Sequence, residues 1–186
     1  ALGRFHGTES TKQLVRFLES DSFRNELATA AISAIGTRND PELTKPLMST
    51  MKDRQAEFSA RDLGRGLVTL ARTAKSSDDK KDVFEFICSF ANHPKSTIRT
   101  STLSALGKLS DDRATAILES YLESSDKRIA DAAKRALDDL NASKPVVPTE
   151  IAELRKSMTE MKRATDKLKM EIKELREKAS ASQTAE

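Results

Sequence analysis

The chain has 186 residues, of which 37% are hydrophobic, 4% aromatic and 33% charged, with a net charge of +3. This composition, with 6 glycines and 5 prolines, favours an all-α protein over a sheet protein. The small charge does not require nucleic acid, no apolar run approaches the roughly 18 residues of a membrane span, and the single Cys88 excludes an intrachain disulfide.

An apolar residue that closes a helical stretch recurs every 31 to 36 residues. The closing residues are Leu2, Ile35, Leu70, Leu106 and Leu137. The residue four positions earlier is small in each later repeat: Ala31, Gly66, Thr102 and Ala133. The residue eight positions earlier is apolar in three repeats: Leu27, Ile98 and Ile129. These offsets mark one buried helical face, on which small residues let a neighbouring helix approach closely.

Another amphipathic stretch precedes each of these helices, and a polar turn separates the two. The four stretches span residues 11–20, 41–51, 82–91 and 114–124. A helix–turn–helix unit that repeats at this period predicts an α-solenoid of about four helix pairs over residues 1–141. Leu2 occupies a closing position without the rest of its repeat, so we expect residues 1–7 to be the remnant of a preceding unit.

Helix boundary signals accompany the pattern. Asp40, Pro41 and Glu42 supply an N-cap, a first-turn proline and an early acid. Gly36 and Gly107 fall where helices are expected to stop, which predicts left-handed C-terminal caps there. Pro46 lies inside a helical pattern and predicts a bend.

These residues resemble HEAT repeats, and "STIRTSTLSALGKLSDD" (96–112) is the best match. The resemblance implies antiparallel helix pairs that stack with a right-handed superhelical sense. The family often pairs an early arginine of the second helix with turn aspartates of neighbouring repeats. Only Arg99 matches that arginine, with Asp111 and Asp112 as turn acids, so we expect stacking to depend on apolar contacts.

The order of segments, beginning with "FSARDLGRGLVTLARTA" (58–74), resembles the C-terminal region of bacterial zinc aminopeptidases of the aminopeptidase N family. That resemblance implies a non-catalytic scaffold that packs on or shields an upstream catalytic domain. The alternatives are a free-standing HEAT adaptor that binds an acidic protein or peptide, and a binder of nucleic-acid phosphates. We expect no membrane partner.

The chain itself has no catalytic motif, and we expect no catalytic, cofactor or metal residue in it. Its only histidines are His6 and His93, without a His-Glu-x-x-His motif, so it cannot supply a zinc site of the family. We interpret His93 as a turn residue and Cys88 as a structural thiol. Since no signal peptide is visible and no disulfide is needed, the cytoplasm is the expected compartment.

The second helices of the repeats present an exposed face opposite their buried face. The basic residues predicted for it are Arg61, Arg65, Arg72, Lys108, Arg128 and Arg135. Glu26 and Asp139 are the acids counted on the same face, which also includes Val68. An excess of bases suits an acidic peptide, a carboxylate terminus or phosphates, whereas a plain solvated helix face is the alternative.

The C-terminal segment changes its period. Residues 142–149 are interpreted as a linker, 150–179 as an amphipathic heptad helix and 180–186 as a frayed tail. The predicted helix-pairing face consists of Ile151, Leu154, Met158, Met161, Leu168, Ile172 and Leu175. Basic residues fill the e positions: Arg155, Lys162, Lys169 and Arg176. This coiled-coil-like pattern predicts either weak homodimerisation or docking on another surface.

Overall fold

A computed structural model describes residues 7–142 and 149–183, which are helical and contain no strand, so the all-α prediction is confirmed for them. The helices are α1 (Thr8–Glu19), α2 (Glu26–Arg38), α3 (Thr44–Asp53), α4 (Ala60–Ala74), α5 (Lys80–Cys88), α6 (Ser96–Leu109), α7 (Ala114–Ser120), α8 (Lys127–Ala142) and α9 (Thr149–Gln183). Short 3-10 turns are η2 (Phe23–Asn25), η3 (Pro41–Leu43) and η4 (Gln55–Glu57). The chain divides into two compact units, Ala1–Lys144 and Pro145–Glu186.

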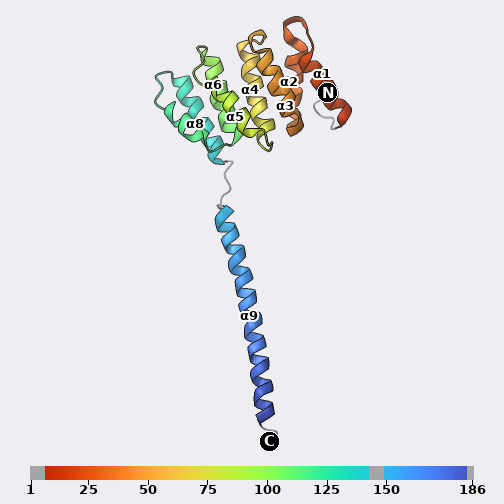
Figure 1. The fold of residues 1–186 in the computed structure, drawn as a ribbon. Helices are drawn as coiled ribbons and strands as arrows, with labels where there is room; N and C mark the ends of the chain where they lie inside the picture. Colours follow the sequence, from red (N-terminus) through yellow and green to blue (C-terminus); the bar gives the residue numbers. More distant parts are fainter. Residues whose placement is uncertain (1–6, 143–148, 184–186) are drawn as a thin grey trace. The chain divides into compact units, whose positions relative to one another are not determined.

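The even-numbered helices of the first unit form a row, in which α2 packs on α4, α4 on α6, and α6 on α8 (Figure 1). The odd-numbered helices cover one side of that row, with α1 on α2, α3 on α4, α5 between α4 and α6, and α7 on α8. Helices that are close in the sequence therefore account for the packing of this unit.

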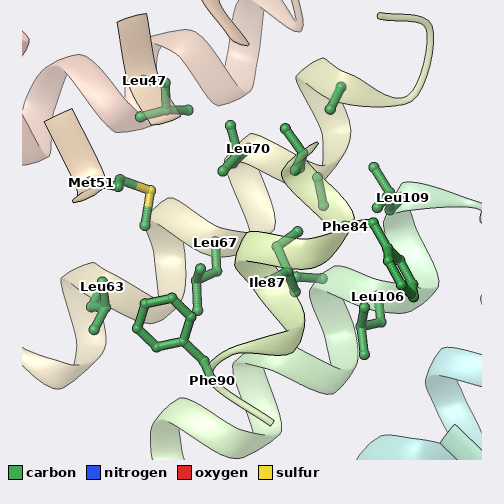
Figure 2. Packing of buried hydrophobic residues seen from close by; sticks show 14 of the residues in the cluster. Leu47, Met51, Leu63, Leu67, Leu70, Phe84, Ile87, Phe90, Leu106 and Leu109 are labelled. Atoms are coloured by element: carbon green, nitrogen blue, oxygen red, sulfur yellow. The ribbon is translucent and has the colours of Figure 1, made fainter. Parts of the chain in front are cut away.

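The predicted closing residues lie in the core between the two sets of helices. Ile35, Leu70 and Leu106 are fully buried, and Leu137 is partly buried against the same cluster. Figure 2 shows how the side chains of Leu70, Ile87 and Leu106 point into the space between α4, α5 and α6. Burial of each such side chain stabilises the fold by about 1.5–3 kcal/mol, which makes this stripe the main source of cohesion.

Gly36 and Gly107 do not cap helices, contrary to the sequence-based prediction. Both lie inside helices, and α2 and α6 end instead at Asn39 and Ser110, each with a φ of 55°. A Cβ atom on Gly107 would lie 2.6 Å from the carbonyl oxygen of Ala136 in α8. The glycine is therefore required because the backbones of α6 and α8 approach closely, and not because of its φ angle.

Pro46, for which the sequence predicts a bend, lies in the first turn of α3, directly after the 3-10 turn η3. The register predicted for Leu27 is wrong. Leu27 is 43% exposed. Because α2 begins only at Glu26, after two left-handed residues, Ala28 faces the core in its place.

Side chains from one odd-numbered helix bond to the end of the preceding odd-numbered helix. After α3, the Arg54 guanidinium donates to the carbonyl oxygens of Leu18 (3.0 Å) and Ser20 (3.2 Å) at the end of α1. After α7, the Tyr121 hydroxyl donates to the carbonyl oxygen of Ala91, 2.9 Å away, beyond the end of α5. These donors satisfy carbonyl groups that a helix end leaves unpaired, and they fix the spacing between successive helix pairs.

The close approach of α6 and α8 predicts a loss of stability in Gly107→Ala. The added methyl group clashes with the α8 backbone, which cannot rotate away, so we expect a loss of about 1–3 kcal/mol in the free energy of unfolding. Urea denaturation of the purified chain measures this loss.

Gly36→Ala is the matched control, because it also replaces a glycine inside a helix. Its methyl group would meet only the side chain of the buried Thr69, at 3.0 Å, and no backbone atom, so any loss of stability should be smaller than in Gly107→Ala. Equal effects of the two substitutions would contradict the backbone contact.

Candidate functional site

The repeat offsets predict one exposed surface on the even-numbered helices, and two grooves bring parts of that predicted set together. We call this surface the even-helix face. Its charged members Arg61, Arg65 and Arg72 come from α4, and Arg128 and Arg135 from α8; all five are exposed. Lys108, from α6, is partly exposed. Repetition of one offset in packed neighbouring helices is what places them on the same side.

A groove of about 420 Å³ runs along this face beside α6. We call it the α6–α8 groove. Its lining includes Val68 of α4, Ser101, Ser104 and Lys108 of α6, and Arg135 and Asp139 of α8. Small side chains form much of its lining: Thr100, Ser101 and Ser104 of α6, and Ala132 and Ala136 of α8.

The charges in the α6–α8 groove are partly compensated. The Lys108 Nζ atom lies 2.9 Å from Oδ2 of Asp139, and both side chains are partly exposed. The Arg135 Nε–H donates to the Asp131 carbonyl oxygen at 3.1 Å, which is a bond to a neutral group. The groove lining thus contains two bases, one acid and three hydroxyl groups, from Thr100, Ser101 and Ser104.

A second groove of about 440 Å³ lies between α2 and α4, and its lining includes Arg24, Glu26, Asp62 and Arg65. Arg65 Nη1 is 3.6 Å from Oδ1 of Asp62. Two bases and two acids balance here, so this groove attracts anions less than the α6–α8 groove does.

The sequence-based charge count of the face missed two carboxylates. Asp62 contacts Arg65, and Asp126, in the turn before α8, lies 3.6 Å from Arg128. Three of the six predicted bases therefore have a carboxylate within 4.0 Å, so the face is less basic than the sequence suggested. Ser101 and Ser104 lie five and two residues before Leu106, on the same exposed face of the helix as Lys108. Because they are uncharged, a count of charges does not include them.

Cys88 and His93 occupy the surroundings that were expected of them. Burial raises the pKa of the half-buried Cys88 thiol, and the nearby Arg113 lowers it to a smaller extent. The thiol is therefore protonated at neutral pH, which makes it a poor nucleophile. The Nδ1 atom of His93 accepts the backbone N–H of Lys95 at 3.1 Å, as a turn histidine does.

Asp111, one of the turn acids noted in the sequence, pairs with Arg113. Both carboxylate oxygens of Asp111 accept from Arg113, from Nε at 3.0 Å and from Nη2 at 2.8 Å. The Arg113 guanidinium carbon also lies 4.3 Å from the centroid of the Phe84 ring. The Nε atom of Arg99 is buried without a hydrogen-bond partner. Hydrogen bonds from Arg113 lower the pKa of Asp111 below its ordinary value.

The predicted helix-pairing face lies on α9. Its described members are all exposed: Ile151, Leu154, Met158, Met161, Leu168 and Ile172. The side chain of Leu175 lies outside the described part of the chain, as do residues 1–6 and most of the predicted linker. Apolar side chains at heptad spacing thus face water along this helix.

Within the described residues, no three His, Cys, Asp or Glu side chains are grouped so that they could hold a metal ion. None of the described helices has the length and apolar character needed to cross a membrane. A scan against protein-family models and a search of curated proteins found no match to this sequence.

The Asp111–Arg113 pair predicts that Arg113→Gln raises the pKa of Asp111 towards its ordinary value. In the wild type the folded-state pKa lies below the unfolded one. The stabilisation by this pair is therefore fully present above about pH 5 and is lost as the pH falls through the folded-state pKa. NMR titration of the Asp111 carboxyl group measures the shift.

Lys80→Gln is the control, because Lys80 is the weakest of the groups that lower this pKa. It should move the titration midpoint less than Arg113→Gln does. An unchanged midpoint in Arg113→Gln would show that the hydrogen bonds do not form in solution.

Proposed function

We propose that residues 1–141 act as a non-catalytic interaction scaffold, a HEAT-like α-solenoid whose even-helix face binds an acidic segment of another polypeptide. The observation that carries the proposal is the α6–α8 groove, which lies on the face that the repeat offsets select. A row of similar helices offers an extended surface without a deep cavity, and that geometry suits a polypeptide better than a small molecule.

The lining of the α6–α8 groove favours a carboxylate-bearing ligand. Lys108 and the outer nitrogens of Arg135 can donate charge-assisted hydrogen bonds, and Ser104 adds a hydroxyl donor between them. Val68 supplies apolar contact for the stem of an acidic side chain. An arriving carboxylate would compete with Asp139 for Lys108, so we expect moderate affinity that falls with salt.

We keep the relation to zinc aminopeptidases as a proposal about a larger parent protein. The support for it is the resemblance described above, which rests on the order of the segments from residues 58–74 onward. In that role the scaffold would pack on a catalytic domain and restrict access to its cleft. The full coding sequence decides the matter: an upstream His-Glu-x-x-His supports it, and a reading frame that starts near Ala1 contradicts it.

The two alternatives differ in their partner. A free-standing adaptor would use the same groove for an acidic protein, and would differ only in having no upstream enzyme. A binder of nucleic-acid phosphates needs many unpaired bases, whereas Arg65, Lys108 and Arg128 each lie within 4.0 Å of a carboxylate. The pairing of these bases favours a protein ligand.

The groove predicts that the double variant Lys108→Ala/Arg135→Ala binds a glutamate-rich peptide more weakly than the wild type does. Loss of two charged donors, which also leaves Asp139 unpaired, should reduce the affinity about tenfold or more. Isothermal titration calorimetry at low salt measures the change.

Lys127→Ala/Lys134→Ala is the matched control, because it removes the same charge from α8 at two residues that do not line the groove. Its affinity should stay close to that of the wild type. Equal weakening in both variants would mean that net charge, and not the groove, attracts the peptide.

A further inference from the structure

The α9 helix carries an apolar seam that the described structure leaves in water. Its members Ile151, Leu154, Met158, Met161, Leu168 and Ile172 are each between 45% and 66% exposed. They occupy heptad positions a and d, the positions that a second helix covers in a coiled coil. A lone helix with so narrow a stripe gains little from folding, so the seam indicates a helical partner.

One edge of this seam is basic and the other is not. The e positions contain Arg155, Lys162 and Lys169. The g positions are mixed: Glu150 and Glu171 are acidic, whereas Ser157 and Ala164 between them are uncharged. In the described part of α9, an ion pair joins Lys167 Nζ to Glu171 Oε1 at 3.9 Å. Neither residue is at an e position. The basic edge is therefore available to charges on a partner.

A second copy of the chain pairs poorly with this edge. In an antiparallel dimer the e positions of the two helices face each other, so that like charges meet. In a parallel dimer they face the g positions of the preceding heptad, where Glu150 matches Arg155 but Ser157 and Ala164 offer no charge to Lys162 and Lys169. Neither arrangement gives the basic edge the acidic row that it would match.

A membrane surface also fits less well than a helix. Residues 149–183 contain no aromatic side chain, which interfacial helices commonly use as an anchor. Their polar side includes Glu153, Glu160 and Asp166, which anionic lipids would repel. Thr165 is the polar residue among the a positions. Its hydroxyl donates to the Met161 carbonyl oxygen at 2.9 Å, so burying Thr165 in a coiled coil requires no polar group from the partner helix.

We propose that α9 is one strand of a heterotypic coiled coil, whose other strand is an amphipathic helix of another protein with Glu or Asp along the edges of its apolar seam. The acidic row pairs with Arg155, Lys162 and Lys169, and the partner's apolar residues cover the a and d positions. This site is separate from the α6–α8 groove, and the proposal does not depend on that groove.

Two synthetic peptides, each about four heptads long with Ile at a and Leu at d, test the proposal with the full chain. One peptide has Glu at its e and g positions, and the other has Lys there. We expect the acidic peptide to bind at least about tenfold more tightly, with an advantage that shrinks as salt is added. Isothermal titration calorimetry measures both affinities.

Charge reversal locates the binding on the seam. The variant R155E/K162E/K169E should prefer the basic peptide. The control K156E/R163E/K167E changes the net charge equally but on the outer side of α9, and it should keep the preference for the acidic peptide. In the groove variant Lys108→Ala/Arg135→Ala this preference should also persist, which separates the two proposals.

Four outcomes would overturn the heterotypic coiled coil. These are equal binding of the two peptides, binding of neither peptide, dimerisation of the chain alone in light scattering, and tighter binding to phosphatidylserine vesicles than to the acidic peptide. Loss of the preference in K156E/R163E/K167E as well would also count against it, because overall charge would then explain the binding.

Discussion

The close approach of neighbouring even-numbered helices is the constraint on which the rest of the first unit depends. A Cβ atom on Gly107 would meet the backbone of Ala136, and one on Gly64 would meet the side chain of Ser101. Absent side chains at these positions let α4, α6 and α8 lie near one another, so that buried residues such as Leu70 and Leu106 fill the space behind them. Dense packing of this kind tolerates little change in volume.

The same constraint shapes the surface that we assign to binding. Small residues between closely packed helices leave shallow open grooves, in which Ser101 and Ser104 lie beside Lys108 and Arg135. The grooves lie on helices of the packed row, in which α2, α4, α6 and α8 each contact the next, so we expect them to need little reordering when a ligand arrives. A preformed surface reduces the entropic cost of association, which can offset the weakness of solvent-exposed charge pairs.

Much of the helical pattern could be predicted from the sequence because burial follows a periodic rule. Ile35, Leu70 and Leu106 are buried where the offsets require. The glycines could not be assigned in the same way. A glycine near a helix end can serve a left-handed φ or a close neighbour, and the neighbour of Gly107 lies far along the chain, at Ala136. The role of Gly107 therefore depends on its contact with another helix, which the sequence near the glycine does not reveal.

The candidate site could be predicted in part, for the same physical reason. Offsets along one helix predict which residues share its exposed face, and Lys108, Arg135 and Val68 do line one groove. Which charges are compensated depends on contacts between helices, such as Lys108 with Asp139. Asp126 reaches Arg128 from a turn, where no helical offset applies.

The central claim is that the α6–α8 groove receives an acidic polypeptide. Amide chemical shifts of the full chain, recorded by NMR as a glutamate-rich peptide is added, test this claim most directly. We expect the largest changes at Ser101, Ser104, Lys108 and Arg135. Changes confined to the odd-numbered helices or to α9, with none along the groove, would contradict it.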